Sequence, residues 1–315
     1  MRTLIFLAFF AFCICAGAQP NSLRDPGFLS LIGRQPAGGG GGGGWTTNAW
    51  VTNWLARIDA TAGSTNRPSS NTTWAVSQFC DELSTQGLLG KMHVVAVFTD
   101  NLACSTNPVI TNGLGGPYGA FTNVGFVASD LTANGLVGNG TSKHLRTGQI
   151  PSQLYSSSTN AGVTIYVYDG NDGSTEDAGV VASASSVMSC YVSYSGTTYW
   201  DTWNQTAGQG RISAANSAWA GYISFVRYYG GSAVYRANSA TNHQTLVSGT
   251  GSGGTVPSTM PLPIYCENHY SLGHRMFTTR RYSFVAFHDS LNATESSAFY
   301  NAIQTLRQRL GGGYR

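Results

Sequence analysis

Strand-like segments dominate this 315-residue chain after residue 93. They are rich in β-branched and aromatic residues, and clusters of Gly, Asn, Ser and Pro separate them as turns separate strands. In one of them, Val163, Ile165 and Val167 occupy every second position, which is the period of a β-strand. The segments are an apolar run at 94–98 and stretches at 161–169, 187–194, 197–204, 221–228, 233–237, 262–266 and 281–288. Because no helical pattern lies between them, we predict a mainly β fold, a two-layer antiparallel β-sandwich.

Helical patterns flank the strands on both sides. Residues 46–62 and 72–85 each carry an apolar stripe at helical spacing, with Thr or Asn at 46–48 to cap the first helix. We therefore expect an N-terminal helical pair within residues 46–92. After the last strand, Asn292 and Glu295 have the spacing of a capping box, which predicts a C-terminal helix. This helix would complete a β-domain over residues 93–315.

The N-terminus has the pattern of a secretory signal peptide. Residues 1–18 combine a basic start, a short apolar run and a small-x-small cleavage site at Ala16-Gly17-Ala18. Residues 19–45 then contain three prolines and an unbroken glycine run, which is typical of a flexible linker. We predict a protein that is secreted or held in the cell envelope, with membrane contact only through the signal peptide before cleavage.

Few residues of the chain are charged, which excludes several classes of function. Charged residues make up 10% of the sequence, against about 25% in an average domain. Cleavage after Ala18 removes Arg2 and leaves sixteen bases against fourteen acids, a net charge of +2. Nucleic-acid binding needs a basic stripe that the sequence does not show. We therefore expect no nucleic-acid partner.

Four cysteines remain after cleavage, and none has zinc-site spacing. In an oxidising compartment they allow three disulfide pairings, and we favour at least one disulfide. Four buried free thiols are the alternative, because cysteine is a common small core residue. The four are Cys80, Cys104, Cys190 and Cys266.

The order of several short motifs resembles a known family. The chain is similar to concanavalin A-like (laminin-G-like) jelly-roll proteins of tailed-phage virions and of uncharacterised exported bacterial proteins. The resemblance covers residues 70–311 and implies a jelly roll with a hint of carbohydrate recognition and no active site. The cysteines and the signal peptide depart from the virion pattern and favour an exported protein. The motifs are KMHVVAVF at 91–98, GLVGNGTSKHLRTG at 135–148, a strand from Gly221 to Arg227, another from Tyr235 to Asn238, RRYSF at 280–284, and the helix at 291–311.

The acidic residues give little support for catalysis. Glycosidases need two carboxylates on either side of a sugar bond, and no strand here carries a Glu-x-Asp-x-x-Glu pattern. A serine elbow, Gly-x-Ser-x-Gly, is missing as well. Distant acids can still meet in space, so a polysaccharide hydrolase with dispersed carboxylates remains an alternative.

One acidic cluster could hold a cation. Asp169, Asn171 and Asp172 end a predicted strand, and Ca²⁺ prefers such oxygen ligands. The spacing does not match an EF-hand loop, and a solvated β-turn explains the same residues better. We otherwise expect no cofactor.

The most promising ligand-binding residues follow one another at the end of a predicted strand. Sugar rings stack on aromatic faces, and Asp and Asn side chains bind hydroxyl groups. A regular strand would turn Trp200 and Trp203 to opposite faces, one buried and one exposed; burial of both at a bulge is the alternative. The candidates are Tyr199, Trp200, Asp201, Trp203 and Asn204.

These features together favour a binding protein. We predict a secreted, non-catalytic module that recognises glycan or another cell-surface polymer. A structural role, as a module displayed on an envelope or virion, is the main alternative. The sequence does not indicate an oligomeric state.

Overall fold

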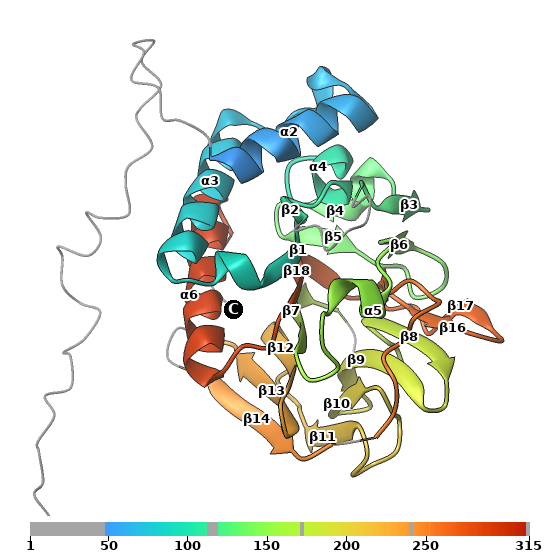
Figure 1. The fold of residues 1–315 in the computed structure, drawn as a ribbon. Coiled ribbons are helices and arrows are strands. Elements are labelled where there is room, and N and C mark those ends of the chain that lie inside the picture. The colour runs from blue at the N-terminus through green and yellow to red at the C-terminus, as the bar shows by residue number, and fades with distance from the viewer. Residues whose placement is uncertain (1–47, 112–118, 171–172, 240–241, 252, 313–315) are drawn as a thin grey trace, which may run out of the picture. The chain divides into compact units, whose positions relative to one another are not determined.

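The computed structural model describes residues 48–111, 119–170, 173–239, 242–251 and 253–312. Within them the chain is mainly β, with two large sheets packed face to face and a helical layer outside one of them (Figure 1). The predicted fold class is therefore confirmed, with the helices forming a third layer on the sandwich.

The larger sheet has nine strands, and its central strands are the most regular. Strands β7, β12 and β18 have the predicted bounds, because each is rich in β-branched and aromatic residues. The strand order is β14 (Gln244–Gly249), β13 (Gly231–Ala237), β12 (Gly221–Tyr228), β7 (Ala161–Asp169), β18 (Arg281–His288), β1 (Met92–Val97) and β2 (Ile110–Thr111), with β5 (Gly135–Val137) on β18 and β4 (Leu131–Thr132) on β5.

The second sheet has six strands and contains an unusual pairing. Its strand β8 pairs in parallel with β16, whereas all other strand pairs in the described residues are antiparallel. The order is β11 (Arg211–Ala215), β10 (Thr197–Thr202), β9 (Ser186–Tyr194), β8 (Ala178–Ser183), β16 (Glu267–His269) and β17 (Gly273–Arg275). A small third sheet contains β15 (Pro263–Ile264), β6 (His144–Arg146) and β3 (Thr122–Val124).

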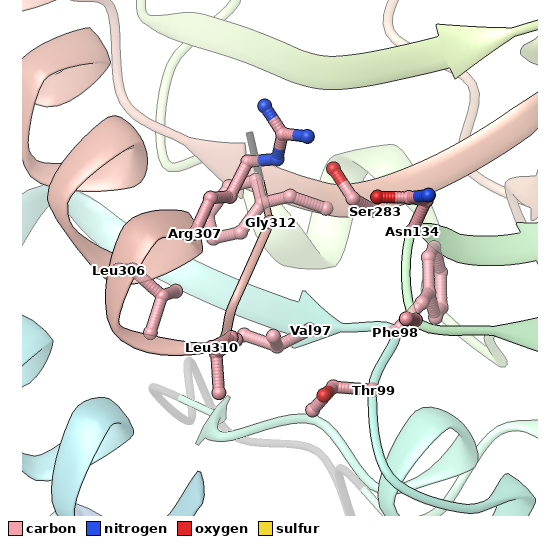
Figure 2. Close-up of a pocket in the computed structure, with 11 residues that line it drawn as sticks. Val97, Phe98, Thr99, Asn134, Ser283, Leu306, Arg307, Leu310 and Gly312 are labelled. Carbon is pink, nitrogen blue, oxygen red and sulfur yellow. The ribbon is translucent and has the colours of Figure 1, made fainter. Parts of the chain in front are cut away.

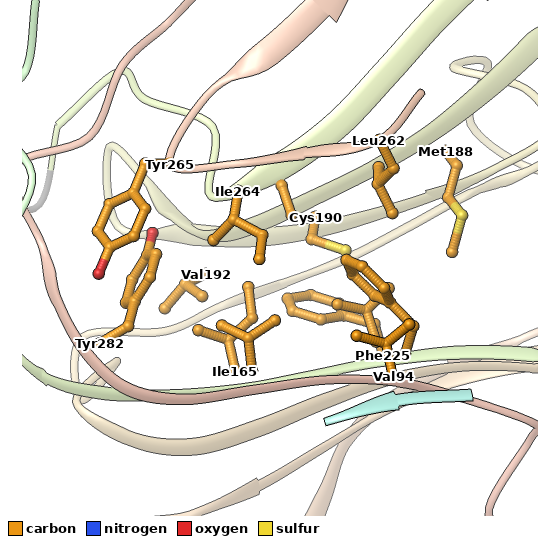
Figure 3. Close-up of a cluster of buried hydrophobic side chains, with 14 of the residues drawn as sticks. Val94, Ile165, Met188, Cys190, Val192, Phe225, Leu262, Ile264, Tyr265 and Tyr282 are labelled. Atoms are coloured by element: carbon orange, nitrogen blue, oxygen red, sulfur yellow. The ribbon is translucent and has the colours of Figure 1, made fainter. Parts of the chain in front are cut away.

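The main hydrophobic core fills the space between the two large sheets (Figure 3). Ile165 and Phe225 enter it from the nine-stranded sheet, and Met188, Cys190 and Val192 enter it from β9. Alternate residues of the nine-stranded sheet, such as Tyr166, Tyr222 and Phe284, point the other way and pack under the helices. Each central strand of the larger sheet is thus buried on both faces.

Three helices form the outer layer. Asn48 caps α2 (Ala49–Ala62) by accepting the Val51 N–H, and Ser69 caps α3 (Ser70–Thr85), which starts two residues earlier than predicted. Helix α6 (Ala293–Arg309) begins with the predicted capping box. Phe79 and Phe299 pack edge-on against Phe284 of β18, with ring centroids 5.8 and 5.7 Å away. Two short helices, α4 (Leu102–Thr106) and α5 (Pro151–Leu154), and 3-10 turns at Ser64–Asn66, Leu89–Lys91 and Ala128–Asp130 complete the elements.

The predicted signal peptide and linker, residues 1–45, lie outside the described residues. No helix in the described ranges is long and apolar enough to cross a membrane.

The four cysteines are buried free thiols in the structure. The predicted disulfide is therefore wrong for this structure, and the alternative of four core thiols is what it shows. Burial raises the pKa of both Cys80 and Cys104 to about 12, and also raises the pKa values of Cys190 and Cys266.

Candidate functional site

A row of polar side chains crosses the outer face of the six-stranded sheet, the face turned away from the core. Strand register places one residue of each strand in this row, because paired residues of adjacent strands lie side by side. Two of the six residues are acids and two are arginines. Acids usually lie in solvent, whereas both acids of this row are buried. In strand order the row is Arg211, Asp201, Ser189, Gly179, Glu267 and Arg275.

Glu176 adds a third carboxyl to the row. It precedes β8, and its side chain folds back over Gly179, which has no side chain of its own. A Cβ on Gly179 would lie 1.3 Å from Glu176 Oε1 and 3.0 Å from Ser189 Oγ. The Glu176 carboxyl therefore occupies the side-chain space of Gly179, between Ser189 on β9 and Glu267 on β16.

Glu176 and Glu267 are both fully buried, although they are acids. The pKa of Glu176 is raised well above its usual range, first by burial and then by the adjacent Glu267 carboxyl. The Ser189 and Tyr191 hydroxyls lower it by a smaller amount. Burial and the neighbouring carboxyl therefore both favour the protonated form of Glu176.

Two ion pairs close the ends of the row. Arg211 donates from Nε and Nη2 to the two oxygens of Asp201, both at 2.6 Å, and Arg275 Nε donates to Glu267 Oε1 at 2.5 Å. Burial raises the pKa of Asp201 in spite of the opposing effect of Arg211. Both arginines remain partly exposed, while Asp201 is buried beneath its partner. The row is therefore a charge-balanced floor whose cations face outward.

Three tyrosines stand beside this floor and line an open cavity. The rings of Tyr191, Tyr194 and Tyr199 meet edge to face, with centroids 5.8 to 6.2 Å apart. The Arg211 guanidinium lies 4.9 Å from the centroid of the Tyr199 ring. We call the cavity the tyrosine site; its volume is about 420 Å³, and it is lined by Tyr191, Tyr194, Tyr199, Gln205, Arg211 and Met276. Aromatic faces beside a few polar groups form a surface that suits a sugar ring.

The five predicted ligand-binding residues do not lie together at one site in the structure. Tyr199 lines the tyrosine site, and Asp201 lies in its floor without any exposure of its own. Trp200 and Trp203 are both buried, so the prediction that one of them is exposed is wrong. Asn204 is 7% exposed and binds the Thr206 N–H and Gln209 Oε1, within its own loop.

The backbone at Trp203 explains the error. β10 ends at Thr202, and Trp203 has a φ of 67°, a left-handed conformation that breaks the strand alternation. Its ring returns to the core, and Nε1 donates to Ser158 O at 2.6 Å. Burial of both indoles, the alternative, is what the structure shows.

The predicted Ca²⁺ ligands receive no support. Asn171 and Asp172 lie outside the described residues. Asp169 forms an ion pair with Arg281 at 3.2 Å. In the described ranges, no group of three or more His, Cys, Asp or Glu residues is placed to hold a metal ion.

Other hollows are less suited to a ligand. A narrow cleft between α6 and the end of β1 has a volume of about 20 Å³, room for about one water molecule (Figure 2). A larger cavity of about 360 Å³ lies at the start of α6, beside the Lys91–Glu295 ion pair. It lacks a cluster of facing rings and a buried polar floor.

Sequence reasoning missed Glu176, Glu267 and Tyr191. Glu176 and Glu267 lie together only because β8 pairs in parallel with β16, and no local sequence pattern predicts that pairing. The one signal within reach was Gly179, three residues after Glu176, since a strand glycine often marks a close approach.

Comparison with known proteins does not define a family. No protein-family model and no curated protein matches the chain. Among solved structures, the chain is similar to the K499G mutant of NanB sialidase from Streptococcus pneumoniae, with 13% identity, a TM-score of 0.38, and coverage of 52% of this chain and 27% of that one. The chain is also similar to a leech intramolecular trans-sialidase, with 7% identity and a TM-score of 0.38. That match covers 56% of this chain and 27% of the trans-sialidase.

A third similar structure is a single domain. Domain 4 of AbnA, an extracellular arabinanase from Geobacillus stearothermophilus solved with arabinotriose, shares 12% identity with a TM-score of 0.41. The match covers 66% of this chain and 98% of that domain. Likenesses of this size do not establish a shared fold or activity, so the tyrosine site has to be judged on its own geometry.

Proposed function

We propose that this protein is a glycan-binding module and that the tyrosine site holds the sugar. The observation that carries the proposal is the cluster of Tyr191, Tyr194 and Tyr199 around a cavity of about 420 Å³. This volume falls in the range of about 300–1,000 Å³ that is usual for small-molecule sites. Gln205 and Arg211 supply donors for hydroxyl groups at the rim.

The charge of the site favours neutral sugars. Arg211 is already bound at both Asp201 oxygens, and Arg275 is bound to Glu267. Each cation is thus neutralised by a buried partner, so the site has no free positive charge for an acidic sugar. Ring stacking and hydroxyl contacts would supply the binding energy, in keeping with the low charge of the whole chain.

The test is binding of soluble gluco-, xylo- and arabino-oligosaccharides, measured by titration calorimetry, to the wild type and to Y199A. Loss of a stacking ring at a binding site costs on the order of 1–2 kcal/mol, so we expect about five- to thirtyfold weaker binding. The matched control is Y229A, which removes a tyrosine that is 89% exposed on the hairpin between β12 and β13. Absence of binding by the wild type, or equal affinity of Y199A and wild type, would overturn the proposal.

A polysaccharide hydrolase is the second candidate, because Glu176 and Glu267 meet beneath the site. Their arrangement disfavours it. Glycosidase carboxyls flank the sugar bond about 5–9.5 Å apart, whereas these two lie against each other and are fully buried. We therefore propose a non-catalytic module, and we expect no release of reducing sugar from the same oligosaccharides.

A further inference from the structure

Four buried oxygens in the floor of the tyrosine site have no hydrogen-bond partner among the described residues. They are both oxygens of the Glu176 carboxyl, Glu267 Oε2 and Ser189 Oγ. All three residues are fully buried, so water does not satisfy these atoms from outside. Unpaired buried polar atoms are rare and costly, and four at one place require an explanation.

One proton accounts for all four atoms. Two ionised carboxylates can only accept hydrogen bonds, so they cannot bond to each other. A proton on Glu176 makes it a donor to Glu267 Oε2, and its other oxygen can then accept from the Ser189 hydroxyl. A Ca²⁺ ion would instead need six to eight oxygens, and the described residues offer four here.

We propose that Glu176 and Glu267 share one proton, and that this protonated pair holds Tyr191 in position at the edge of the tyrosine site. Glu176 acts here as a positioning residue and does not itself contact the sugar. Its N–H donates to Met276 O at 2.9 Å, and Met276 lines the same cavity. Its carboxyl lies beside Ser189 on β9, the strand that bears Tyr191, so Glu176 connects β9 to Met276 through its side chain and its backbone. Only the effect on sugar binding rests on the proposed function.

The groups around Glu176 make the shared proton specific to this place. The acid on β16, Glu267, opposes its ionisation, and the nearby arginines Arg211 and Arg275 are each bound to another acid. Thiols on β9 and just before β16 lie near and are themselves held neutral by burial. The titratable and charged neighbours are Cys190, Tyr191, Asp201, Arg211, Cys266, Glu267 and Arg275.

The direction of the pH effect follows from linkage. Because the pKa of Glu176 is higher in the folded chain than in the unfolded chain, the unfolded chain releases this proton first as pH rises. The stabilisation that the proton on Glu176 gives to the folded chain is fully present below the pKa of the unfolded chain, about 4.3. It is lost as pH rises through the pKa of Glu176 in the folded chain. Gln at position 176 keeps a donor group and an acceptor oxygen and does not titrate in this pH range.

The experiment measures urea unfolding of wild type, E176Q and the control D81N from pH 5 to pH 9, without sugar. Asp81 is exposed on α3, so D81N removes one acid outside the site. Up to the folded pKa, we expect the unfolding equilibrium constant of wild type to rise about tenfold per pH unit relative to E176Q. D81N should follow wild type. An equal pH slope in wild type and E176Q would overturn the shared proton.

Two further measurements keep the proposal falsifiable. Infrared spectra of wild type at neutral pH should show the C=O stretch of a protonated carboxylic acid. E267Q removes the repulsion and should therefore lower the pH at which the slope ends. If millimolar Ca²⁺ stabilised wild type but not E176Q, a cation would hold the oxygens and the proposal would fall. If the slopes differed as expected but no oligosaccharide bound, the proton pair would stand and the glycan function would fail.

Discussion

Replacing Gly179 by Ala tests whether the Glu176 carboxyl lies where the structure puts it. The backbone of Gly179 is ordinary strand backbone, so alanine would be accepted there on conformational grounds alone. The added Cβ would lie 1.3 Å from Glu176 Oε1 and 2.4 Å from its Cδ. The methyl group and the carboxyl cannot both occupy this space, so G179A must expel Glu176 from the row.

The expected cost has two parts. Overfilling a packed site costs about 1–3 kcal/mol. Expulsion of Glu176 also leaves Glu267 Oε2 and Ser189 Oγ without partners, which adds about 1–3 kcal/mol. We expect G179A to lower the free energy of unfolding by about 2–4 kcal/mol, the lower half of that combined range, because side chains around the site can relax.

The double variant E176A/G179A provides the decisive comparison. With the carboxyl gone, the new methyl group fills vacated space, and Ala in a strand is better than Gly by about 0.5–1 kcal/mol. The two substitutions should therefore compensate, with an interaction energy of about 2–3 kcal/mol in a cycle of urea denaturation curves at pH 6. Additivity of the two single effects within about 0.5 kcal/mol would show that Glu176 does not occupy the space above Gly179.

Two other predictions concern buried groups outside the tyrosine site. Asp177 and Arg280 are fully buried, and Arg280 Nη1 donates to the Asp177 carboxylate at 2.6 Å. D177N should therefore lower the free energy of unfolding, measured by urea denaturation, by about 3–5 kcal/mol. A loss under about 1 kcal/mol would contradict this ion pair. The four thiols should resist a water-soluble disulfide reagent in the native chain lacking residues 1–18. All four should react once this chain is unfolded without reductant. Fewer than four reactive thiols would reveal a disulfide.

Regular elements with strong local patterns could be predicted from the sequence. β7, β12 and β18 are rich in β-branched and aromatic residues over eight or nine positions, and the capping box fixes the start of α6. Short strands were less accessible. The stretch 262–266 contains only the two-residue strand β15, because Tyr265 has a φ of 79° and turns the chain out of the ladder.

The candidate site was accessible only in part. Tyr199 could be proposed from its aromatic, amide-rich neighbourhood, but its neighbours in space come from another strand. Tyr191 faces Tyr199 through the register of β9 and β10, and Glu176 reaches Glu267 through a parallel pairing. Pairing of this kind is decided by the packing of whole sheets, so the residues around 176 and 267 carry no local sign of it. The signal peptide of residues 1–18 stays a prediction of the sequence.

The position of β18 has a consequence for how the chain acquires its structure. This strand comes late in the sequence, yet it lies in the larger sheet between β7 and β1. Until β18 has been synthesised, β7 and β1 each present an unpaired edge, and the two halves of the sheet are not joined through it. Contacts that close so late over long sequence separations make folding slow and leave strand edges exposed meanwhile. We therefore expect the nascent chain to be most prone to aggregation before its C-terminal part is available.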